Sequence, residues 1–324
     1  MVDDNLNISE LTVPINFFNY FCRKDNLEKV ALEINGIHKL LKKNGIALNI
    51  ALDQTCIGGK NLVKDFSNTF DSFMNLMPYK GVGIVLREPT FIQYFSWKYP
   101  FVPFTINAPS AYGIFDFHLR SRFYHEKFNK NNNLKKVYLP PDLNRDFRAL
   151  KRIRDSAKYD LCVTVNEGEV LNSPYRLSEL IALSHMDENT DPSYYKKIKE
   201  IFDDFRIEVY EKEPWRIIAS PWIRPEDIKV YEEIGINTLV LLAGEEDMEG
   251  LEDRVNAYIK RSYKGNLTDL LRKKPFKTKG YINNDKLESF LKKIRKGPFN
   301  TCIFDCDRCG ICEEFFKLMG KIDL

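Results

Sequence analysis

The chain has 324 residues, of which 44% are hydrophobic and 29% are charged. This length and composition suit a globular protein with a sizeable buried core and exclude disorder as its main state. Lysine and arginine number 49 against 46 acidic residues, so the formal net charge is only +3. A balance this even gives no whole-protein case for binding nucleic acid or an anionic membrane.

The N-terminal segment and the apolar runs bear on where the protein works. The segment contains Asp3 and Asp4 and no apolar stretch of the kind that secretory signals carry. No run approaches the roughly 20 apolar residues of a membrane helix, and Leu239–Ala243 belongs to one of the longest. We therefore expect a soluble, cytoplasmic protein with no membrane segment.

Short β-branched runs alternate with segments of helical apolar spacing along the chain. Strands are predicted at Thr12–Asn16, Lys29–Asn35, Ile46–Asp53, Val82–Leu86, Val102–Asn107, Lys136–Leu139, Leu161–Val165, Arg216–Ser220 and Asn237–Ala243. Helices are predicted at Leu62–Leu76, Asp142–Ser156, Tyr194–Phe205, Pro225–Ile234 and Met248–Tyr263. This alternation predicts an α/β fold of parallel strands with crossover helices, and about eight units favour a closed TIM-like (β/α) barrel.

The pattern changes toward the C-terminus. Lys273–Lys279 is basic and is predicted to be a linker, and a helix is predicted over Asn284–Lys296. We expect residues 1–270 to form the barrel domain, and residues 271–324 to form a linker, a helix and a small cysteine-rich tail.

Four of the seven cysteines lie together in this tail with the spacing C-x3-C-x2-C-x2-C: Cys302, Cys306, Cys309 and Cys312. An odd total without a secretory signal argues against a disulfide framework. Four thiolates select zinc or an iron–sulfur cluster. Structural zinc sites usually split their cysteines into two separated pairs, whereas this dense run resembles that of bacterial ferredoxins. We predict a [4Fe–4S] cluster here, with zinc as the alternative.

Polar residues follow the predicted strands, where a barrel of this type builds its active site. They are Asn16, Glu33, Asp53, Arg87, Glu88, Asn107, Asn166, Glu167, Ser220, Arg224 and Glu226. Each alone could cap a helix or form a loop ion pair. As a set they predict the polar rim of a pocket for a polar or anionic small group.

Two arginines stand out because both follow presumed strand ends: Arg176 and Arg224. In a closed barrel their guanidinium groups would face one mouth, where buried like charges need neutralising carboxylates. If Glu167 and Glu226 pair with them, the arginines are scaffold. If a ligand supplies the carboxylates, the arginines bind a carboxylated small molecule through bidentate contacts.

Two single residues with reactive side chains, His185 and Cys56, each allow a functional and a structural interpretation. His185 is either a proton donor or substrate ligand above the barrel, or a helix-end histidine that caps carbonyl groups. Cys56, in the loop T-C-I-G-G, is either a ligand or nucleophile, or simply packed. His38, His118 and His125 have no ligand-like partners in the sequence and receive no role.

The stretch Val165–His185 reads V-N-E-G-E-V-L-N-S-P-Y-R-L-S-E-L-I-A-L-S-H. It resembles the signature of the collagenase-like peptidase family (U32), which is close to N-E-G-C-x3-C-P-x-R-x2-H with a second histidine further on. Leu143–Ile153, Ser220–Asp227 (S-P-W-I-R-P-E-D), Ala257–Leu270 and the tail motif C-G-I-C resemble other parts of the same family. The resemblance runs from Val13 to Cys312.

The resemblance implies a barrel-like fold with an iron–sulfur cluster. The better-understood members are oxygen-independent hydroxylases that act on RNA bases or quinone precursors, some with prephenate as the hydroxyl donor. Several members work as pairs of related subunits. It therefore also implies RNA or a small aromatic or carboxylated molecule as substrate, and a related barrel subunit as a heterodimer partner.

The sequence departs from the family signature at three positions. The two signature cysteines fall on Glu169 and Ser173, and the first signature histidine falls on Glu179. Carboxylate and hydroxyl oxygens are poor substitutes for thiolate, so we expect no cluster in the barrel and a cluster only in the tail. Asn166, Glu167, Arg176 and the distal His185 persist, and a catalytic set of His185, Arg176, Arg224 and Glu167 is predicted.

Three functions remain open from the sequence. The first is a non-proteolytic enzyme of the oxygen-independent hydroxylase type with a cluster in the tail. The second is a non-catalytic partner subunit of a related enzyme, which the missing barrel cysteines would suit. The third is a genuine peptidase, for which no H-E-x2-H, G-x-S-x-G or Cys–His–Asn signature is present.

Overall fold

The structure is a computed structural model that describes residues 8–15, 24–52, 60–77, 81–87, 89–108, 130, 133–184, 192–243, 249–272, 281–297, 301–302 and 304–319. Seven strands form one sheet in chain order, each parallel to the next. They are β1 (Glu10–Pro14), β2 (Ala47–Leu52), β3 (Val82–Leu86), β4 (Phe104–Asn107), β5 (Leu134–Tyr138), β6 (Asp160–Thr164) and β7 (Thr238–Val240). The predicted parallel α/β architecture is confirmed.

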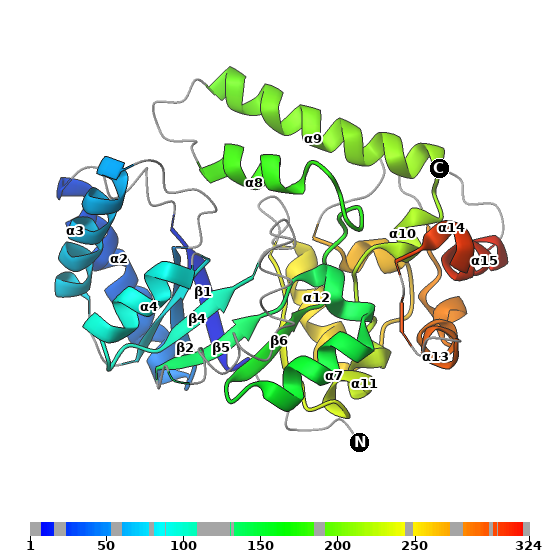
Figure 1. Ribbon diagram of the computed structural model, residues 1–324, viewed down its shortest axis with the longest axis horizontal. Helices are drawn as coiled ribbons and strands as arrows, with labels where there is room; N and C mark the ends of the chain where they lie inside the picture. Colours follow the sequence, from blue (N-terminus) through cyan, green and yellow to red (C-terminus); the bar gives the residue numbers. More distant parts are fainter. Residues whose placement is uncertain are drawn as a thin grey trace.

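The sheet curls but does not close (Figure 1). No pairing joins β1 to β7 among the described residues, so the sheet is an open half-barrel. The prediction of a closed barrel is therefore confirmed only in its parallel, TIM-like character. The described strands number seven, where the sequence suggested about eight units.

The core lies on both faces of this sheet. Ile50, Phe104, Val137 and Val163 in the central strands are fully buried, and all five residues of β3 are buried. Strands covered on both faces read as continuous apolar runs, which is how β3 was identified from the sequence. Packing of this kind fixes the positions of the strand ends and of the loops that follow them.

Helices and short 3-10 turns connect and cover the strands. They are α2 (Lys24–Lys43), α3 (Lys60–Leu76), α4 (Pro89–Lys98), η1 (Pro141–Arg145), α7 (Phe147–Ser156), α8 (Arg176–Ser184), α9 (Pro192–Lys212), α10 (Arg216–Ala219), η2 (Pro225–Asp227), α11 (Ile228–Glu232), α12 (Glu249–Lys260), η3 (Leu267–Leu270), η4 (Asn284–Leu287), α13 (Phe290–Lys296), α14 (Cys306–Cys309) and α15 (Ile311–Leu318). Figure 1 shows α8 and α9 stacked over one end of the molecule. No described helix is long and apolar enough to cross a bilayer.

Two predicted strands are helical, which corrects the sequence prediction. Lys29–Asn35 lies inside α2, where Val30, Ala31 and Ile34 are buried and Leu32 is 73% exposed. That burial has the helical period, because a strand would have placed Leu32 on the same face as Val30 and Ile34. The segment Arg216–Ser220 contains α10, and its apolar run is too short for periodicity to separate a strand from a buried helix.

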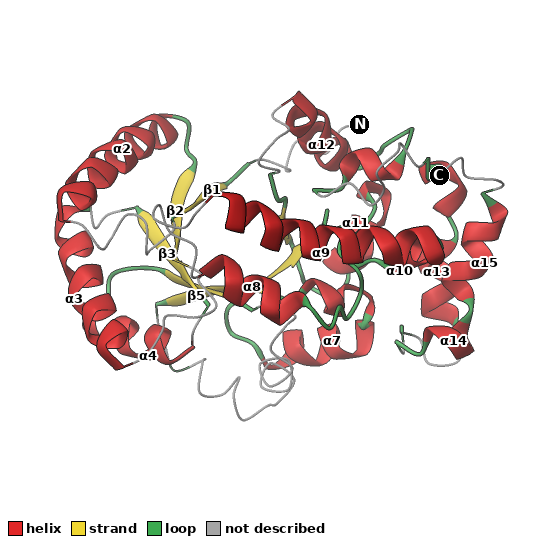
Figure 2. Ribbon diagram, turned by 90° about the horizontal axis from the view of Figure 1, so that it is seen from above, coloured by secondary structure: helices red, strands yellow, loops and turns green. Residues whose placement is uncertain are grey.

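The C-terminal elements pack against the part of the molecule farthest from α2 and α3 (Figure 2). The Phe290 ring of α13 lies 5.7 Å from Trp222 and 5.2 Å from Phe315 of α15, measured between ring centroids. The backbone N–H of Cys302 donates a hydrogen bond to the carbonyl oxygen of Arg145 at 3.0 Å. The cysteine-rich segment is thereby joined to the end of η1. The predicted linker, residues 273–279, lies outside the described residues.

Candidate functional site

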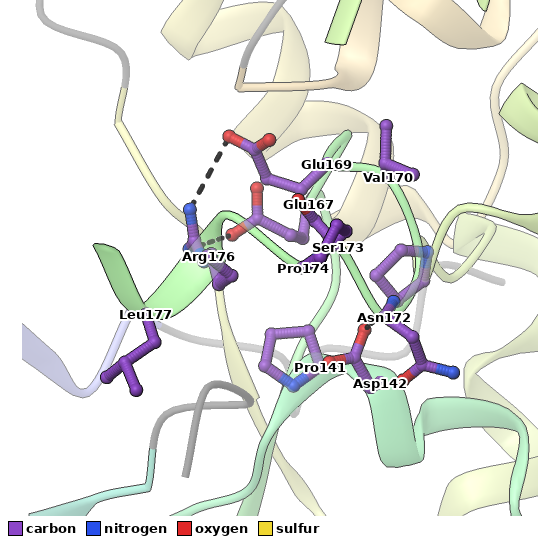
Figure 3. A pocket seen from close by; sticks show the side chains of 11 residues that line it. Pro141, Asp142, Glu167, Glu169, Val170, Asn172, Ser173, Pro174, Arg176 and Leu177 are labelled. Carbon is purple, nitrogen blue, oxygen red and sulfur yellow. Dashed lines mark hydrogen bonds and ion pairs between the residues drawn. The ribbon is translucent and has the colours of Figure 1, made fainter. Parts of the chain in front are cut away.

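A cavity of about 360 Å³ opens beyond the carboxyl end of β6 (Figure 3). Its walls come from η1, from the loop that follows β6 and from the start of α8. The residues that matter for its chemistry are Asp142, Glu167, Glu169, Ser173, Arg176 and Pro221. The carboxyl end of a parallel strand is where α/β folds place their binding sites, so this cavity is the candidate functional site.

Buried hydrogen bonds hold the loop after β6 in place. The Ser220 hydroxyl lies 2.8 Å from the carbonyl oxygen of Glu169, to which it donates, and the Tyr210 hydroxyl donates to the carbonyl oxygen of Gly168 at 3.0 Å. The Asn144 side-chain amide donates to the carbonyl oxygen of Thr164 at 2.7 Å. Because these groups are buried, the loop backbone is fixed by partners from distant parts of the chain. The carboxylates on the loop are therefore positioned by the fold.

Arg176 is the centre of an ion-pair network at the cavity (Figure 3). Its guanidinium lies 3.5 Å from Glu167 Oε2, 3.5 Å from Glu169 Oε1 and 3.0 Å from Glu179 Oε2. Glu167 is 2% exposed and Glu169 is 9% exposed. Burial alone would lower the pKa of Arg176, but the three surrounding carboxylates outweigh it and raise that pKa. Arg176 therefore stays protonated and is shared among three glutamates.

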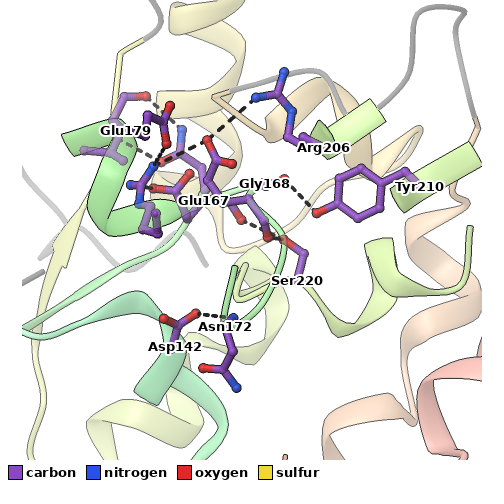
Figure 4. A network of polar contacts seen from close by, with 12 residues as sticks. Asp142, Glu167, Gly168, Asn172, Glu179, Arg206, Tyr210 and Ser220 are labelled. Carbon is purple, nitrogen blue, oxygen red and sulfur yellow. Dashed lines mark hydrogen bonds and ion pairs between the residues drawn. The ribbon is translucent and has the colours of Figure 1, made fainter. Parts of the chain in front are cut away.

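A second arginine supports the network from α9. Arg206 is 7% exposed and lies 3.8 Å from Glu169 Oε1 and 2.7 Å from Asp203 Oδ1. Figure 4 shows Arg206 and Tyr210 approaching the loop from the side away from Asp142 and Asn172. The sequence did not indicate Arg206 or Asp203, because they lie on a helix whose position over the loop is a property of the tertiary structure.

The signature positions of the family-like stretch gather at this cavity. Glu169 and Ser173, which replace the two signature cysteines, both line it. Glu179, which replaces the signature histidine, lies on α8 and hydrogen-bonds to Arg176 at 3.0 Å. Positions that would supply sulfur and nitrogen ligands in the family are here occupied by hard oxygen donors, and two of them, Glu169 and Glu179, are paired to Arg176. These residues do not fit an iron–sulfur cluster in the barrel.

Arg224 does not lie beside Arg176, although the sequence predicted that both would face one mouth of a closed barrel. It is 3% exposed, its Nε donates to Asn284 Oδ1 at 3.0 Å, and its Nη2 lies 3.3 Å from Glu226 Oε2. It does not line the cavity that Arg176 lines. The structure thus brings Arg176 and Glu167 together and pairs Arg224 with Glu226 and Asn284.

Asp227, next to this pair, gives a prediction for pH dependence. Burial raises the pKa of Asp227 from 3.8 to about 6, against the opposing effect of Arg224. Since the folded state holds this proton more tightly than the unfolded chain, the free energy of unfolding falls as the pH rises from about 4 to about 6, by up to about 3 kcal/mol. Asp227→Asn should remove that fall.

The measurement is urea denaturation of the wild type and Asp227→Asn at several pH values between about 4 and about 7. Asp285→Asn, at an exposed position on η4, serves as the control and should keep the wild-type profile. Identical pH profiles for all three proteins would contradict the role given to Asp227.

The four tail cysteines lie within electrostatic range of one another. Burial raises the pKa of the Cys312 thiol to about 12, Arg145 acts in the opposite direction, and Cys302, Cys306 and Cys309 raise it further. Burial also raises the pKa of Cys302, on which Cys309 acts in the same direction. Cys312 therefore lies within electrostatic range of the other three tail cysteines and of the buried Arg145.

Gly310 shapes the tail between its two short helices. It has a φ of 63°, a left-handed conformation that favours glycine, and it ends α14 and precedes α15. In chemical type the four thiols fit zinc or an iron–sulfur cluster. No three histidine, cysteine or acidic side chains of the described residues converge at metal-binding distances, so the thiols would have to close around the group.

Arg145 links the start of the cysteine-rich tail to the end of α10. It is 4% exposed, and its Nη1 and Nη2 each lie 2.6 Å from a carbonyl oxygen, of Ile218 and of Ser220 respectively. Its guanidinium lies 4.6 Å from the Trp222 ring centroid and 4.9 Å from that of Phe290. This role of Arg145 could not be predicted from the sequence, because the partners of its side chain lie more than 70 residues away.

Several predicted site residues are not brought to the cavity. Glu33 is exposed on α2, far from any strand end, because the strand predicted there is part of that helix. Asn166 is buried and hydrogen-bonds to Leu242 through both its amide and its carbonyl group. Several residues lie outside the described part of the chain: Asn16, Asp53, Cys56, Glu88, His118, His125 and His185.

One curated protein and one solved structure are similar to this chain. No model of a known protein family matches the chain. The chain is 25% identical over 306 residues to an uncharacterized protease of Methanocaldococcus jannaschii, covering 92% of this chain and 83% of that protein. It is also similar to a solved structure of a U32 peptidase, with a TM-score of 0.44, 15% identity and coverage of 73% of this chain and 85% of that one.

Proposed function

We propose that this chain, which the comparisons relate to the U32 collagenase-like peptidase family, is a non-proteolytic iron–sulfur protein of the oxygen-independent hydroxylase type. In this proposal the cavity at the end of β6 binds an RNA base or a small aromatic or carboxylated substrate. The observation that carries it is that the cavity is formed by the signature-like loop itself, with Glu167 and Arg176 in its wall.

The charges in the cavity argue against the peptidase alternative. In peptidases that use two carboxyl groups, the two groups share one proton. A cation placed between them would disfavour that shared proton. Here the guanidinium of Arg176 lies 3.5 Å from both Glu167 and Glu169.

The proposed roles of the site residues follow from their positions. Glu167 contacts the substrate, and Arg176, 3.5 Å from Glu167 Oε2, holds that side chain in a fixed orientation. His185, six residues beyond Glu179 in sequence, is proposed as the proton donor. Arg224 is assigned a supporting role, since its partners Glu226 and Asn284 lie away from the cavity wall.

The proposed cluster would be held by Cys302, Cys306, Cys309 and Cys312. Such a cluster supplies one-electron transfer or structural support when bound. The buried guanidinium of Arg145, whose charge favours the ionised form of Cys302 and Cys312, would offset part of the negative charge of four thiolates. Zinc at the same four sulfurs is the alternative.

Anaerobic iron and sulfide analysis with electron paramagnetic resonance tests the cluster. We expect about four iron and four sulfide per wild-type chain, and loss of most of both in Cys309→Ser, because serine oxygen is a poor ligand for iron in such clusters. Cys162→Ala is the matched control, since Cys162 is fully buried in β6 and burial raises its pKa to about 12. Stoichiometric zinc without iron in the wild type would contradict the proposal.

A specific observation favours a second candidate, a non-catalytic partner subunit of a related enzyme. Glu169 and Glu179, at two signature positions, are engaged with Arg176 in an ion-pair network that needs no cofactor. If the chain is such a partner, it should co-purify with a related barrel subunit that retains the signature cysteines. Hydroxylation would then require both chains, and substitution of Glu167 in this chain would leave the rate of hydroxylation unchanged.

A further inference from the structure

The wall of the β6 cavity carries a negative charge. Its charged lining residues are Asp142, Glu167, Glu169 and Arg176, three carboxylates against one guanidinium. Glu179 adds a fourth carboxylate next to Arg176. Arg206 lies 3.8 Å from Glu169 and is paired more closely, at 2.7 Å, with a further carboxylate, Asp203, so negative charge remains in excess. Because Glu167 and Glu169 are buried, their charge acts on a bound ligand more strongly than it would at an open surface.

The guanidinium in this wall is already committed to protein carboxylates. Arg176 lies within 3.5 Å of Glu167, Glu169 and Glu179. A ligand carboxylate would have to displace one of these glutamates and leave it buried without a cation, which is costly. An anionic ligand is therefore disfavoured at the position where the sequence suggested one.

Glu167 has hydrogen-bonding capacity that the described residues do not fill. Its side chain is 3% exposed and pairs with Arg176 through Oε2, while its Oε1 is buried and has no hydrogen-bond partner in the described part of the chain. A buried carboxylate oxygen without a donor is costly, because the oxygen has given up its bonds to water. The group that fills this position must therefore donate a hydrogen bond, and the surrounding charge favours one that is also positive.

We propose that the β6 cavity binds the protonated primary amino group of a small molecule, and that Glu167 Oε1 accepts a hydrogen bond from that ammonium group. Asp142, from η1 on the facing wall, adds long-range attraction to the same charge. This inference rests on the proposed function in one respect, namely that the cavity is the substrate site. It names the substrate class as an amine instead of a carboxylate.

The test is isothermal titration calorimetry of the full-length protein at low ionic strength. The ligands are n-butylamine and putrescine as amines, and succinate and prephenate as carboxylates of similar size. We expect wild-type protein to bind the amines and not the carboxylates, with an affinity that weakens as salt is added. Binding of a carboxylate in preference to both amines, or of neither class, would overturn the inference.

Variants locate the binding at Glu167. Glu167→Gln should weaken amine binding about tenfold or more, because it removes a charge-assisted hydrogen bond. Asp142→Asn, at a less buried position, should fold even if Glu167→Gln does not, and should weaken binding about threefold through loss of charge alone. Glu252→Gln, at an exposed position on α12, is the matched control and should bind as the wild type does. Unchanged amine binding in both cavity variants would overturn the assignment.

The result of the amine-binding test can be distinguished from the result of the test of the proposed function. Iron and sulfide are measured on the same preparation, and they report on the tail cysteines alone. Amine binding without a cluster would leave this inference standing and remove the iron–sulfur proposal. A cluster without amine binding would do the reverse.

Discussion

Replacing Arg145 with methionine is expected to lower the free energy of unfolding by about 3–5 kcal/mol. The guanidinium is 4% exposed, donates to two carbonyl oxygens at 2.6 Å, and lies 4.6 Å from the Trp222 ring centroid and 4.9 Å from that of Phe290. Methionine fills similar space but leaves both carbonyl groups buried without a donor and removes the contact between the cation and the aromatic rings. Urea denaturation at neutral pH measures the loss.

Two further variants separate the role of Arg145 from a general effect of losing an arginine. Arg148→Met, at an exposed position of the adjacent helix α7, should change stability by less than about 0.5 kcal/mol. Arg145→Lys keeps the charge but cannot donate to both carbonyl oxygens with one planar group, so it should recover only part of the loss. Equal stabilities for Arg145→Met and Arg148→Met would contradict the packing described for Arg145.

Replacing Arg176 with glutamine is expected to destabilise the protein by about 2–4 kcal/mol at neutral pH. The substitution leaves Glu167, Glu169 and Glu179 close together with their shared cation removed. The side chain of Arg176 is 19% exposed, so solvent screening places the effect below that of a fully buried arginine. Urea denaturation of the variant at pH values between about 5 and about 8 measures it.

The sign of the pH dependence is specific to this mechanism. Without the guanidinium, the crowded carboxylates favour proton uptake in the folded state, so the variant should regain stability relative to the wild type as the pH falls. Arg152→Gln, at an exposed position on α7, is the control and should show no such recovery. A destabilisation by Arg176→Gln that is the same at pH values of about 5 and about 8 would rule out the carboxylate network as its cause.

Local apolar patterns explain which parts of the fold the sequence predicted. β3 is a run of five buried residues and was predicted with its observed bounds, because a parallel strand covered on both faces must be apolar throughout. The same reasoning failed for Lys29–Asn35, where β-branched and apolar residues also satisfy a helical period. Short apolar runs fit both periods, and only packing against β2 decides between them.

The candidate site likewise has a part that could be predicted from the sequence and a part that depends on the tertiary structure. Glu167, Glu169, Arg176 and Glu179 lie within one short stretch, so their proximity follows from a single loop and the first turn of α8. The sequence therefore pointed to the correct stretch. The sequence also led to the prediction that Arg176 and Arg224 face the same pocket, because a closed barrel would bring all strand ends to one mouth. The curled, open sheet and the contact with Asn284 place Arg224 elsewhere.

The sequence by itself determined the parallel α/β class, the loop that carries the cavity and the grouping of four cysteines near the C-terminus, because each depends on residues close together in the chain. The tertiary structure alone decided that the sheet stays open, that Arg206 reaches Glu169 and that Arg145 joins the cysteine segment to the end of α10. The physical reason is that a buried charge is stable only beside its counter-charge and hydrogen-bond partners. For Arg145 and Arg206 those partners are far away in sequence and are set by the packing of whole elements.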